Sequence, residues 1–494
     1  MRTEATISGA ENPGVMRPSE AVVWGQWTLG AWRLDPALVL AFCATFVLVL
    51  CLPPILNDGD TLWQIRTGEW ILAHRAIPSV DPFSFTAGDR PWFAHEWLSE
   101  TLMALAYGAA GMAGVMALAA TAVGLTAAIL LHWFRRFLPG LYAVVALVVA
   151  LSNAAPSMLA RPHLLAWPCL ALWCVGLLSA RANRIAPSFW LLPVMVLWVN
   201  LHGSFMAGLV LPGFFLAEAL LDAGTGRRET LVRWGAFILA SLAAALLNPN
   251  GLSGTLFPIH HVGLASLAWI GEWQATDFGA PQPMELLLVG ALLLGLSRRL
   301  VLPPVRIVLF LGLVHAALAH SRNQPLLGLI GMLLLAEPLG VALGRGAALD
   351  LGRIWRHGAM AAACLAAIGL GWRAVTPLPP ERTGAAFAAV LDRVPPAVRA
   401  RNVLNEYGLG GALIFSGGRP FVDSRADLYG DAFLNRYIEI TTPGRGDALD
   451  RALASYDIGW TLFPSGHRLI ATLDRNPGWR RLIEAGGLVI HIRE

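Results

Sequence analysis

Two carboxylates one residue apart follow the first apolar stretch of the chain, in the sequence Asn57-Asp58-Gly59-Asp60. The pair His95-Glu96 lies further along the same polar segment, among several tryptophans. Charged groups at the point where an apolar helix leaves a bilayer lose hydration, so their presence there indicates a function. Carboxylate and imidazole groups act as general acids and bases, and they bind divalent cations such as Mn²⁺ or Mg²⁺. The segment 57–112 is therefore predicted to form the floor of a catalytic site.

The elements that position this segment are membrane helices. The chain has 494 residues, of which 56% are hydrophobic and only 14% are charged, so most of it must lie in lipid. We predict a polytopic α-helical membrane protein with about 11 spans. The apolar runs of suitable length are 37–56, 113–134, 141–157, 164–180, 188–200, 205–222, 234–247, 283–297, 303–319, 324–342 and 357–375.

The orientation of these spans follows from their arginines. Arginines occupy every second loop, and the positive-inside rule places those loops in the cytoplasm. They are Arg135-Arg136, Arg181 and Arg184, Arg227-Arg228 and Arg233, Arg298-Arg299, and Arg345, Arg353 and Arg356. The tail 1–36 is then cytoplasmic, and the run that begins at Ala37 is an uncleaved anchor. Leu98–Gly111 is apolar but short, and we interpret it as an interfacial or re-entrant helix that leads into the second span.

The composition becomes more polar after the last span, so residues 376–494 are predicted to form a small α/β domain outside the cytoplasm. Expected strands are Asn402–Phe415, Arg419–Ser424 and Gly487–Ile492, and expected helices are Ala385–Arg393, Asp427–Ile440 and Asp447–Tyr456. This domain has no cysteine and must be stable without disulfides. The membrane domain therefore comprises residues 37–375, with the outer loop 57–112.

With this topology, the unusual polar residues of the chain all fall on the outer face. They are Asp58, Asp60, Trp63, His95, Glu96, Arg161, His163, Asn200, His202, Glu272, His320 and Arg322. Because the arginines of other loops set the topology, this coincidence supports a single outer site. No carboxylate or arginine lies near the midpoint of a predicted span, which disfavours an ion-coupled carrier.

Each motif also has a purely structural interpretation. The aspartates could cap the helix that begins at Thr61, and His95-Glu96 could open the helix at Leu98. Arg161 and Arg322 could reach out to lipid phosphates. In the C-terminal domain, Asp423-Ser424-Arg425-Ala426-Asp427-Leu428-Tyr429 is interpreted as a turn with a helix cap, although it could contact an acceptor.

An acidic first outer loop on a multispan helical protein with a C-terminal outer domain resembles the GT-C superfamily of glycosyltransferases. The closer likeness is to bacterial enzymes of the protein-mannosyltransferase and aminoarabinose-transferase type. It is carried by Asp60-Thr61-Leu62-Trp63, Gly68-Glu69-Trp70-Ile71, Asp81-Pro82-Phe83-Ser84-Phe85-Thr86 and His95-Glu96-Trp97-Leu98. His95-Glu96 departs from the protein-mannosyltransferase pattern.

The resemblance implies transfer of a sugar from a polyprenyl-phosphate donor, with inversion, at the outer face of a bacterial inner membrane. Asp60, with Asp58 second, matches the catalytic carboxylate and would act as the base. Arg161 and Arg322, with His163 and His320, would hold the departing phosphate. The other substrate-binding candidates are Trp63, Asn200, His202 and Glu272. Alternatively, Asp58, Asp60, His95 and Glu96 could bind Mn²⁺ or Mg²⁺.

The expected partners are the lipid-linked sugar, membrane lipid, and an acceptor that is a glycan, a lipid or a protein. No basic stripe with interleaved aromatics indicates nucleic acid. Two alternatives from other classes stay open. One is a lipid-sugar or polysaccharide transporter, and the other is a non-catalytic scaffold of an envelope-polysaccharide assembly, which would tolerate loss of both aspartates.

Overall fold

The computed structural model describes residues 35–88, 90–297, 299–344, 352–444 and 447–494. Of the predicted cytoplasmic tail, residues 1–34 lie outside this description, as do Arg298 and Arg345 from the orientation argument. The fold below is that of the unit formed by Asp35–Glu494.

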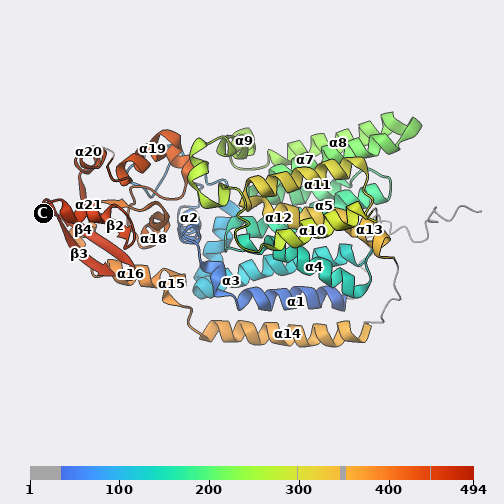
Figure 1. Cartoon of the computed structure of the whole chain (residues 1–494), viewed down its shortest axis with the longest axis horizontal. Coiled ribbons are helices and arrows are strands. Elements are labelled where there is room, and N and C mark those ends of the chain that lie inside the picture. Colours follow the sequence, from blue (N-terminus) through green and yellow to red (C-terminus); the bar gives the residue numbers. More distant parts are fainter. Residues whose placement is uncertain (1–34, 89, 298, 345–351, 445–446) are drawn as a thin grey trace, which may run out of the picture. The chain divides into compact units, whose positions relative to one another are not determined.

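Each of the eleven predicted spans corresponds to a helix in the described part of the chain (Figure 1). These helices are α1 (Pro36–Leu50), α3 (Trp97–Phe134), α4 (Gly140–Ala154), α5 (Pro162–Ala182), α6 (Leu192–Leu201), α7 (Phe205–Asp222), α8 (Arg227–Ala245), α10 (Pro283–Leu296), α11 (Pro304–Ala319), α13 (Met332–Leu343, preceded by α12, Gln324–Leu326) and α14 (Gly352–Val375). Among the described residues, six helical stretches are long and apolar enough to cross a membrane, and four more apolar helices are shorter. The predicted polytopic helical class is confirmed.

Local sequence explains where two of these helices begin and bend. Asp35 caps α1, since its side chain accepts the backbone N–H of Ala37 at 2.9 Å, and Pro36 occupies the first turn. Helix α3 changes direction at Ala110–Gly111, where Gly111 has a φ of +59° that favours glycine. The helix thus divides at the position where the sequence separates a short apolar segment from the second span.

Helix α2 (Asp60–His74) lies between the bundle and the C-terminal domain, because glycines allow close approach on both sides (Figure 1). A Cβ on Gly68 would lie 2.0 Å from the carbonyl oxygen of Glu100 in α3. A Cβ on Gly411, in α18 (Gly410–Phe415), would lie 2.3 Å from the carbonyl oxygen of Gly59. A larger residue at Gly68 would push the middle of α2 away from α3, and one at Gly411 would push α18 away from the start of α2.

The C-terminal domain is built on a four-stranded sheet of order β1-β2-β4-β3, in which β1 and β2 are parallel and the other pairs antiparallel. Its strands are β1 (Asn402–Asn405), β2 (Ile458–Pro464), β3 (Trp479–Ala485) and β4 (Leu488–Arg493). Its other helices are α15 (Pro380–Thr383), α16 (Ala385–Leu391), α17 (Pro396–Arg399), α19 (Ala426–Thr441), α20 (Ala448–Ser455) and α21 (Ile470–Arg475). The predicted α/β class of this domain is confirmed, as are its three predicted helices.

Two strand predictions were wrong. Only the first four residues of Asn402–Phe415 form a strand, and the apolar end of this segment is α18, which packs on α2. Arg419–Ser424 is not a strand but an irregular segment beneath the outer loop, where Thr86 Oγ1 donates to the carbonyl of Phe421 at 2.6 Å. In both places, contact with the outer loop replaces sheet pairing.

Candidate functional site

The two aspartates stand at the start of α2. Asp60 is its first residue, and the Asp58 carboxylate accepts the backbone N–H of Asp60 at 3.0 Å. Asp58 therefore stabilises the helix start, as the capping interpretation expected. Both carboxylates also bond to Arg161, which comes directly before α5, so capping is only part of their role.

Arg161 is surrounded by three carboxylates. Its Nη2 lies 2.8 Å from Asp58 Oδ1 and 2.8 Å from Asp60 Oδ2, and its Nε also binds Asp58. Its Nη1 donates to Glu272 Oε2 at 3.1 Å. Burial acts to lower the pKa of Arg161, but the carboxylates outweigh it and raise that pKa. Arg161 is thus a fixed positive charge held by protein carboxylates.

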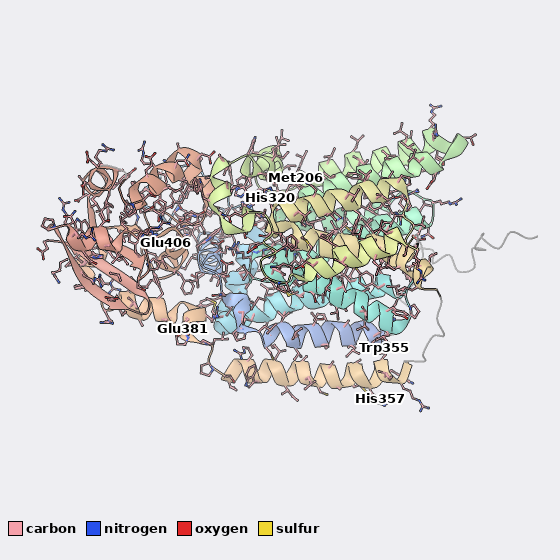
Figure 2. All side chains as sticks on the ribbon, viewed as in Figure 1. Met206, His320, Trp355, His357, Glu381 and Glu406 are labelled. Atoms are coloured by element: carbon pink, nitrogen blue, oxygen red, sulfur yellow. The ribbon has the colours of Figure 1, made fainter. Side chains whose placement is uncertain are left out.

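Arg322 is held more loosely on the other side of Glu272. Its Nη1 lies 3.3 Å from Glu272 Oε1, and its guanidinium carbon is 4.1 Å from the ring centroid of Trp273. His320, which is labelled in Figure 2, bonds through Nδ1 to the Trp273 carbonyl at 2.6 Å, and its ring meets the Trp273 ring edge to face with centroids 5.6 Å apart. Glu272 therefore bridges two guanidinium groups, one with each of its oxygens.

The Asp60 carboxylate receives a hydrogen bond from a residue of the C-terminal domain. Ser424 Oγ donates to Asp60 Oδ1 and itself accepts the indole N–H of Trp63 at 3.0 Å. Burial raises the pKa of Asp60, and the charge of Asp58 adds to this, whereas Arg161 and the Ser424 hydroxyl act in the opposite direction. Asp60 is a carboxylate oriented on one oxygen by Ser424 and on the other by Arg161.

A second group of titratable side chains surrounds Glu96. Glu96 is the N-cap residue of α3, so His95-Glu96 does precede a helix as expected, but the Glu96 side chain makes no cap hydrogen bond there. Instead, Glu96 Oε1 lies 3.4 Å from His202 Nε2 and 3.6 Å from His95 Nε2. His202 Nδ1 accepts the backbone N–H of Ser204 at 3.0 Å, so a neutral His202 carries its proton on Nε2, facing Glu96.

Burial is the main influence on this Glu96 group. It raises the pKa of Glu96 to about 8, although the charges of Arg161 and Arg322 oppose the shift. It lowers the pKa of His95 to about 3, with help from the charge of His261, and lowers that of His202 well below its usual range. A protonated Glu96 beside neutral histidines is a proton reservoir within electrostatic reach of both arginines.

His163 and Asn200 hold backbone and aromatic groups in place around this site. The His163 ring lies 5.9 Å from the His202 ring, and its Nε2 bonds to the Ser157 carbonyl at 2.6 Å. Asn200 accepts the indole N–H of Trp97 at 2.8 Å. Most of the predicted site residues thus fall in the two groups or contact them, whereas the Asn200 side chain bonds to Trp97 and to the carbonyls of Val196 and Leu247.

Sequence reasoning missed two contributors, Ser424 and Trp273. Ser424 lies in the polar cluster that was interpreted mainly as a turn, and only its contact with Asp60 reveals its place. The signal was the density of polar residues from Asp423 to Asp427. Trp273 adjoins Glu272 in the sequence, and its ring beneath Arg322 depends on the tertiary fold.

A second arginine ties the C-terminal domain to the outer loop. Arg425 Nη1 lies 2.8 Å from Asp81 Oδ1, and its Nη2 lies 2.6 Å from Asp423 Oδ2. The guanidinium also covers the ring of Trp92, at 4.6 Å from its centroid. All three charged side chains are at most 1% exposed. This buried group fixes the segment that carries Ser424 against the floor of the site.

The four residues considered as metal ligands, Asp58, Asp60, His95 and Glu96, do not converge on one point. Among the described residues, no group of three or more histidine, cysteine, aspartate or glutamate side chains is placed to hold a metal ion. Asp58 and Asp60 turn to Arg161, whereas Glu96 turns to His95 and His202. In this arrangement the four side chains do not form one donor set, and no step below uses a metal.

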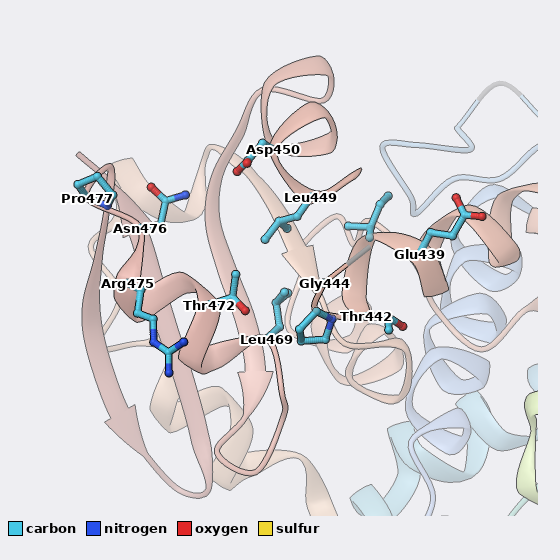
Figure 3. Close-up of a pocket in the computed structure, with 12 residues that line it drawn as sticks. Glu439, Thr442, Gly444, Leu449, Asp450, Leu469, Thr472, Arg475, Asn476 and Pro477 are labelled. Carbon is cyan, nitrogen blue, oxygen red and sulfur yellow. The ribbon is translucent and has the colours of Figure 1, made fainter. Parts of the chain in front are cut away.

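A cleft of about 330 Å³ lies elsewhere in the C-terminal domain (Figure 3). Its walls come from the ends of α19, α20 and α21, with Asp450, Thr472 and Arg475 among the lining residues. None of the predicted site residues lines it. The convergence of charges, and not this hollow, therefore defines the candidate site.

No protein-family model matches the chain, and no curated protein matches it. Among solved structures, it is similar to the crystal structure of ArnT from Cupriavidus metallidurans bound to undecaprenyl phosphate. The two sequences are 13% identical, the match covers 92% of this chain and 97% of that chain, and the TM-score is 0.50. The GT-C-like membrane fold predicted from the sequence is thus confirmed as a fold.

Proposed function

We propose that this protein is an inverting glycosyltransferase that moves a sugar from a polyprenyl-phosphate donor to an acceptor at the outer face of the inner membrane. The observation that carries the proposal is the convergence of Asp60 with Arg161 and Arg322 in one part-exposed site. The fold supports it, since the similar ArnT structure is described as bound to undecaprenyl phosphate, a lipid of the donor's class.

The reaction needs a base on one side of the anomeric carbon and positive charge on the other. In the proposed step, an acceptor hydroxyl attacks that carbon and gives its proton to Asp60. The bond between the anomeric carbon and the phosphate oxygen breaks, and its electron pair leaves with the lipid phosphate. One displacement by one base inverts the anomeric centre.

Arg161 and Arg322 are suited to stabilise the departing phosphate. Glu272 already bridges them as an anion, at 3.1 and 3.3 Å, and its side chain is 36% exposed. A donor phosphate that takes the place of this carboxylate would receive charge-assisted hydrogen bonds from both guanidinium groups. Asp58 would meanwhile keep Arg161 oriented through its two contacts.

Asp60→Asn tests the proposal, because asparagine keeps the shape but cannot accept the proton. Purified wild type should release sugar from one of a panel of radiolabelled polyprenyl-phosphate sugars. Asp60→Asn should lower kcat by about 10²- to 10⁴-fold, the usual contribution of a general base. Asp277→Asn, a change at an exposed aspartate, should leave turnover unchanged.

Two outcomes would contradict the proposed glycosyltransferase function. If wild type neither binds nor turns over any donor, the scaffold becomes the better function. Donor binding without turnover, in wild type and Asp60→Asn alike, would favour the transporter. Thermal melting of each variant separates loss of chemistry from loss of the fold.

A further inference from the structure

A pocket of about 480 Å³ lies at the junction of the bundle and the C-terminal domain, apart from the candidate site. Its walls come from the bend of α3 at Gly111 and from the last turn of α14. The end of α15 at Thr383 and the residue after α18, Ser416, complete them. Tyr107 of α3 and Phe415 of α18 meet edge to face beside it, with ring centroids 5.5 Å apart. None of its lining residues belongs to the Asp60 or Glu96 groups.

Arg373 lines this pocket and is only 5% exposed. It makes no ion pair with any described residue, and its Nε is buried without a hydrogen-bond partner. Its guanidinium carbon lies over the ring of Trp372, at 4.2 Å from the centroid. A buried cation without an anion is costly, so this position calls for a counter-ion.

The other arginines of similar burial show that this is unusual. Among the described residues, the remaining arginines that are less than a tenth exposed are Arg181, Arg306 and Arg425. Each of these binds at least one carboxylate. Arg373 alone in this set lacks an anionic partner among the described residues, which leaves room for an anion from outside the protein.

The surroundings of the pocket identify the source of that anion as a membrane lipid. Helix α14 exposes apolar side chains along its length, including Ile368 at 65% and Val375 at 80%, so its surface suits lipid. The pocket itself combines apolar walls with the hydroxyl groups of Thr383 and Ser416. A phosphate group with acyl chains fits this arrangement better than a soluble anion does, because the chains can continue along α14.

We propose that Arg373 and its pocket bind the phosphate of an anionic phospholipid. The guanidinium would pair with the phosphate, the hydroxyl groups would hold its remaining oxygens, and the bound lipid would join α3, α14 and the C-terminal domain. This site is separate from the proposed donor site and does not depend on the glycosyltransferase function.

The test compares lipid binding by the full-length protein in mild detergent, measured by native mass spectrometry and thermal melting. Phosphatidylglycerol is the probe, with phosphatidylcholine and inorganic phosphate as comparison ligands. We expect phosphatidylglycerol to bind and to raise the Tm of wild type. Arg373→Gln should weaken this binding by roughly 10- to 100-fold, the value of one charge-assisted hydrogen bond.

Two further variants make the result specific. Arg356→Gln, at an exposed arginine of the same helix, should bind the lipid as wild type does. Ala388→Phe fills the pocket but keeps the cation, and it should lose binding even if Arg373→Gln fails to fold. Without lipid, Arg373→Gln should be at least as stable as wild type, because it removes an unpaired buried charge.

Two results would overturn the proposal. One is phosphatidylglycerol binding by Arg373→Gln or Ala388→Phe with the affinity of wild type. The other is an equal rise in Tm with inorganic phosphate alone, which would assign the pocket to a soluble anion.

Discussion

Arg425 and Arg161 each bind two aspartates, yet the surroundings of the two arginines differ. The Arg425 side chain is 1% exposed, and its partners Asp81 and Asp423 are fully buried. The Arg161 side chain is 21% exposed, Asp60 is 19% exposed, and Glu272 is 36% exposed. Both groups have more carboxylates than guanidiniums, so charge balance does not distinguish them. The two groups differ in how far solvent reaches their side chains.

The difference separates a closed ion cluster from one that is open to exchange. Around Arg425 every partner is also bonded elsewhere, as when Asp81 accepts the backbone N–H of Ser84 at 2.8 Å. Nothing there can exchange without exposing a buried charge. Around Arg161, the bridging Glu272 can give way to an incoming anion at little cost, because it is partly solvated. We therefore expect the buried Arg425 cluster to stabilise the C-terminal domain and the part-exposed Arg161 cluster to be able to exchange a partner for a ligand.

The largest expected effect is on the closed cluster. Arg425→Met would leave Asp81 and Asp423 buried without a cation, at a cost of about 3–5 kcal/mol. We expect a lower Tm and rapid proteolysis of the C-terminal domain. Arg399→Met is the matched control, because its partner Asp392 is 76% exposed and the pair contributes about 0–1 kcal/mol. Equal melting of the two variants would show that the Arg425 cluster does not anchor the domain.

The open cluster should respond in activity and not in stability. Arg322→Gln removes one of two cations expected on the departing phosphate, and kcat should fall by about 10²- to 10³-fold. Its Tm should stay close to that of wild type, because Arg322 has one carboxylate partner that is partly exposed. Arg299→Gln, at an exposed arginine, serves as the control. Loss of stability as large as in Arg425→Met would remove the contrast between the clusters.

The smallest effect on activity is expected for Ser424, the residue of the C-terminal domain that bonds to Asp60. Ser424→Ala removes a hydrogen bond to the charged form of Asp60, so the pKa of Asp60 should rise further. Because the base acts in its deprotonated form, activity is lost as pH falls through that pKa, and the acidic limb of the kcat/KM profile should move to higher pH.

The size of the Ser424→Ala effect should be about tenfold at the acidic end of the profile and smaller above it. Ser424→Thr keeps the hydroxyl and should restore the wild-type profile. A uniform loss across all pH values, without a shifted limb, would mean that Ser424 acts on structure and not on the base.

The sequence indicated much of this site, because hydropathy and arginine placement decide which loops share a side of the membrane. That reasoning brought Asp60, Arg161, Glu272 and Arg322 together although they are far apart in the chain. It could not indicate Ser424, whose contact depends on how a separate domain packs. Packing of that kind leaves no periodic pattern in the sequence.

Strands β2 and β3 were not predicted from the sequence, and each has a physical reason for this. Strand β2 is buried along nearly its whole length, so its residues do not alternate between polar and apolar as a half-exposed strand does. Strand β3 lies at the sheet edge and exposes Arg480 and Arg481, which hide its period. The end of Asn402–Phe415 is rich in apolar residues, which suggested a strand. It forms helix α18 instead, and Gly411 of this helix packs closely against Gly59.

The separation of Asp60 and Ser424 by 364 residues has a consequence for how the protein is made. A ribosome delivers the aspartates, then the arginines, and the serine only after nearly the whole polypeptide has been synthesised. A nascent or truncated chain therefore inserts its helices with the base lacking its hydroxyl partner. The orientation of Asp60 by Ser424 is thus acquired only when the C-terminal domain folds against α2.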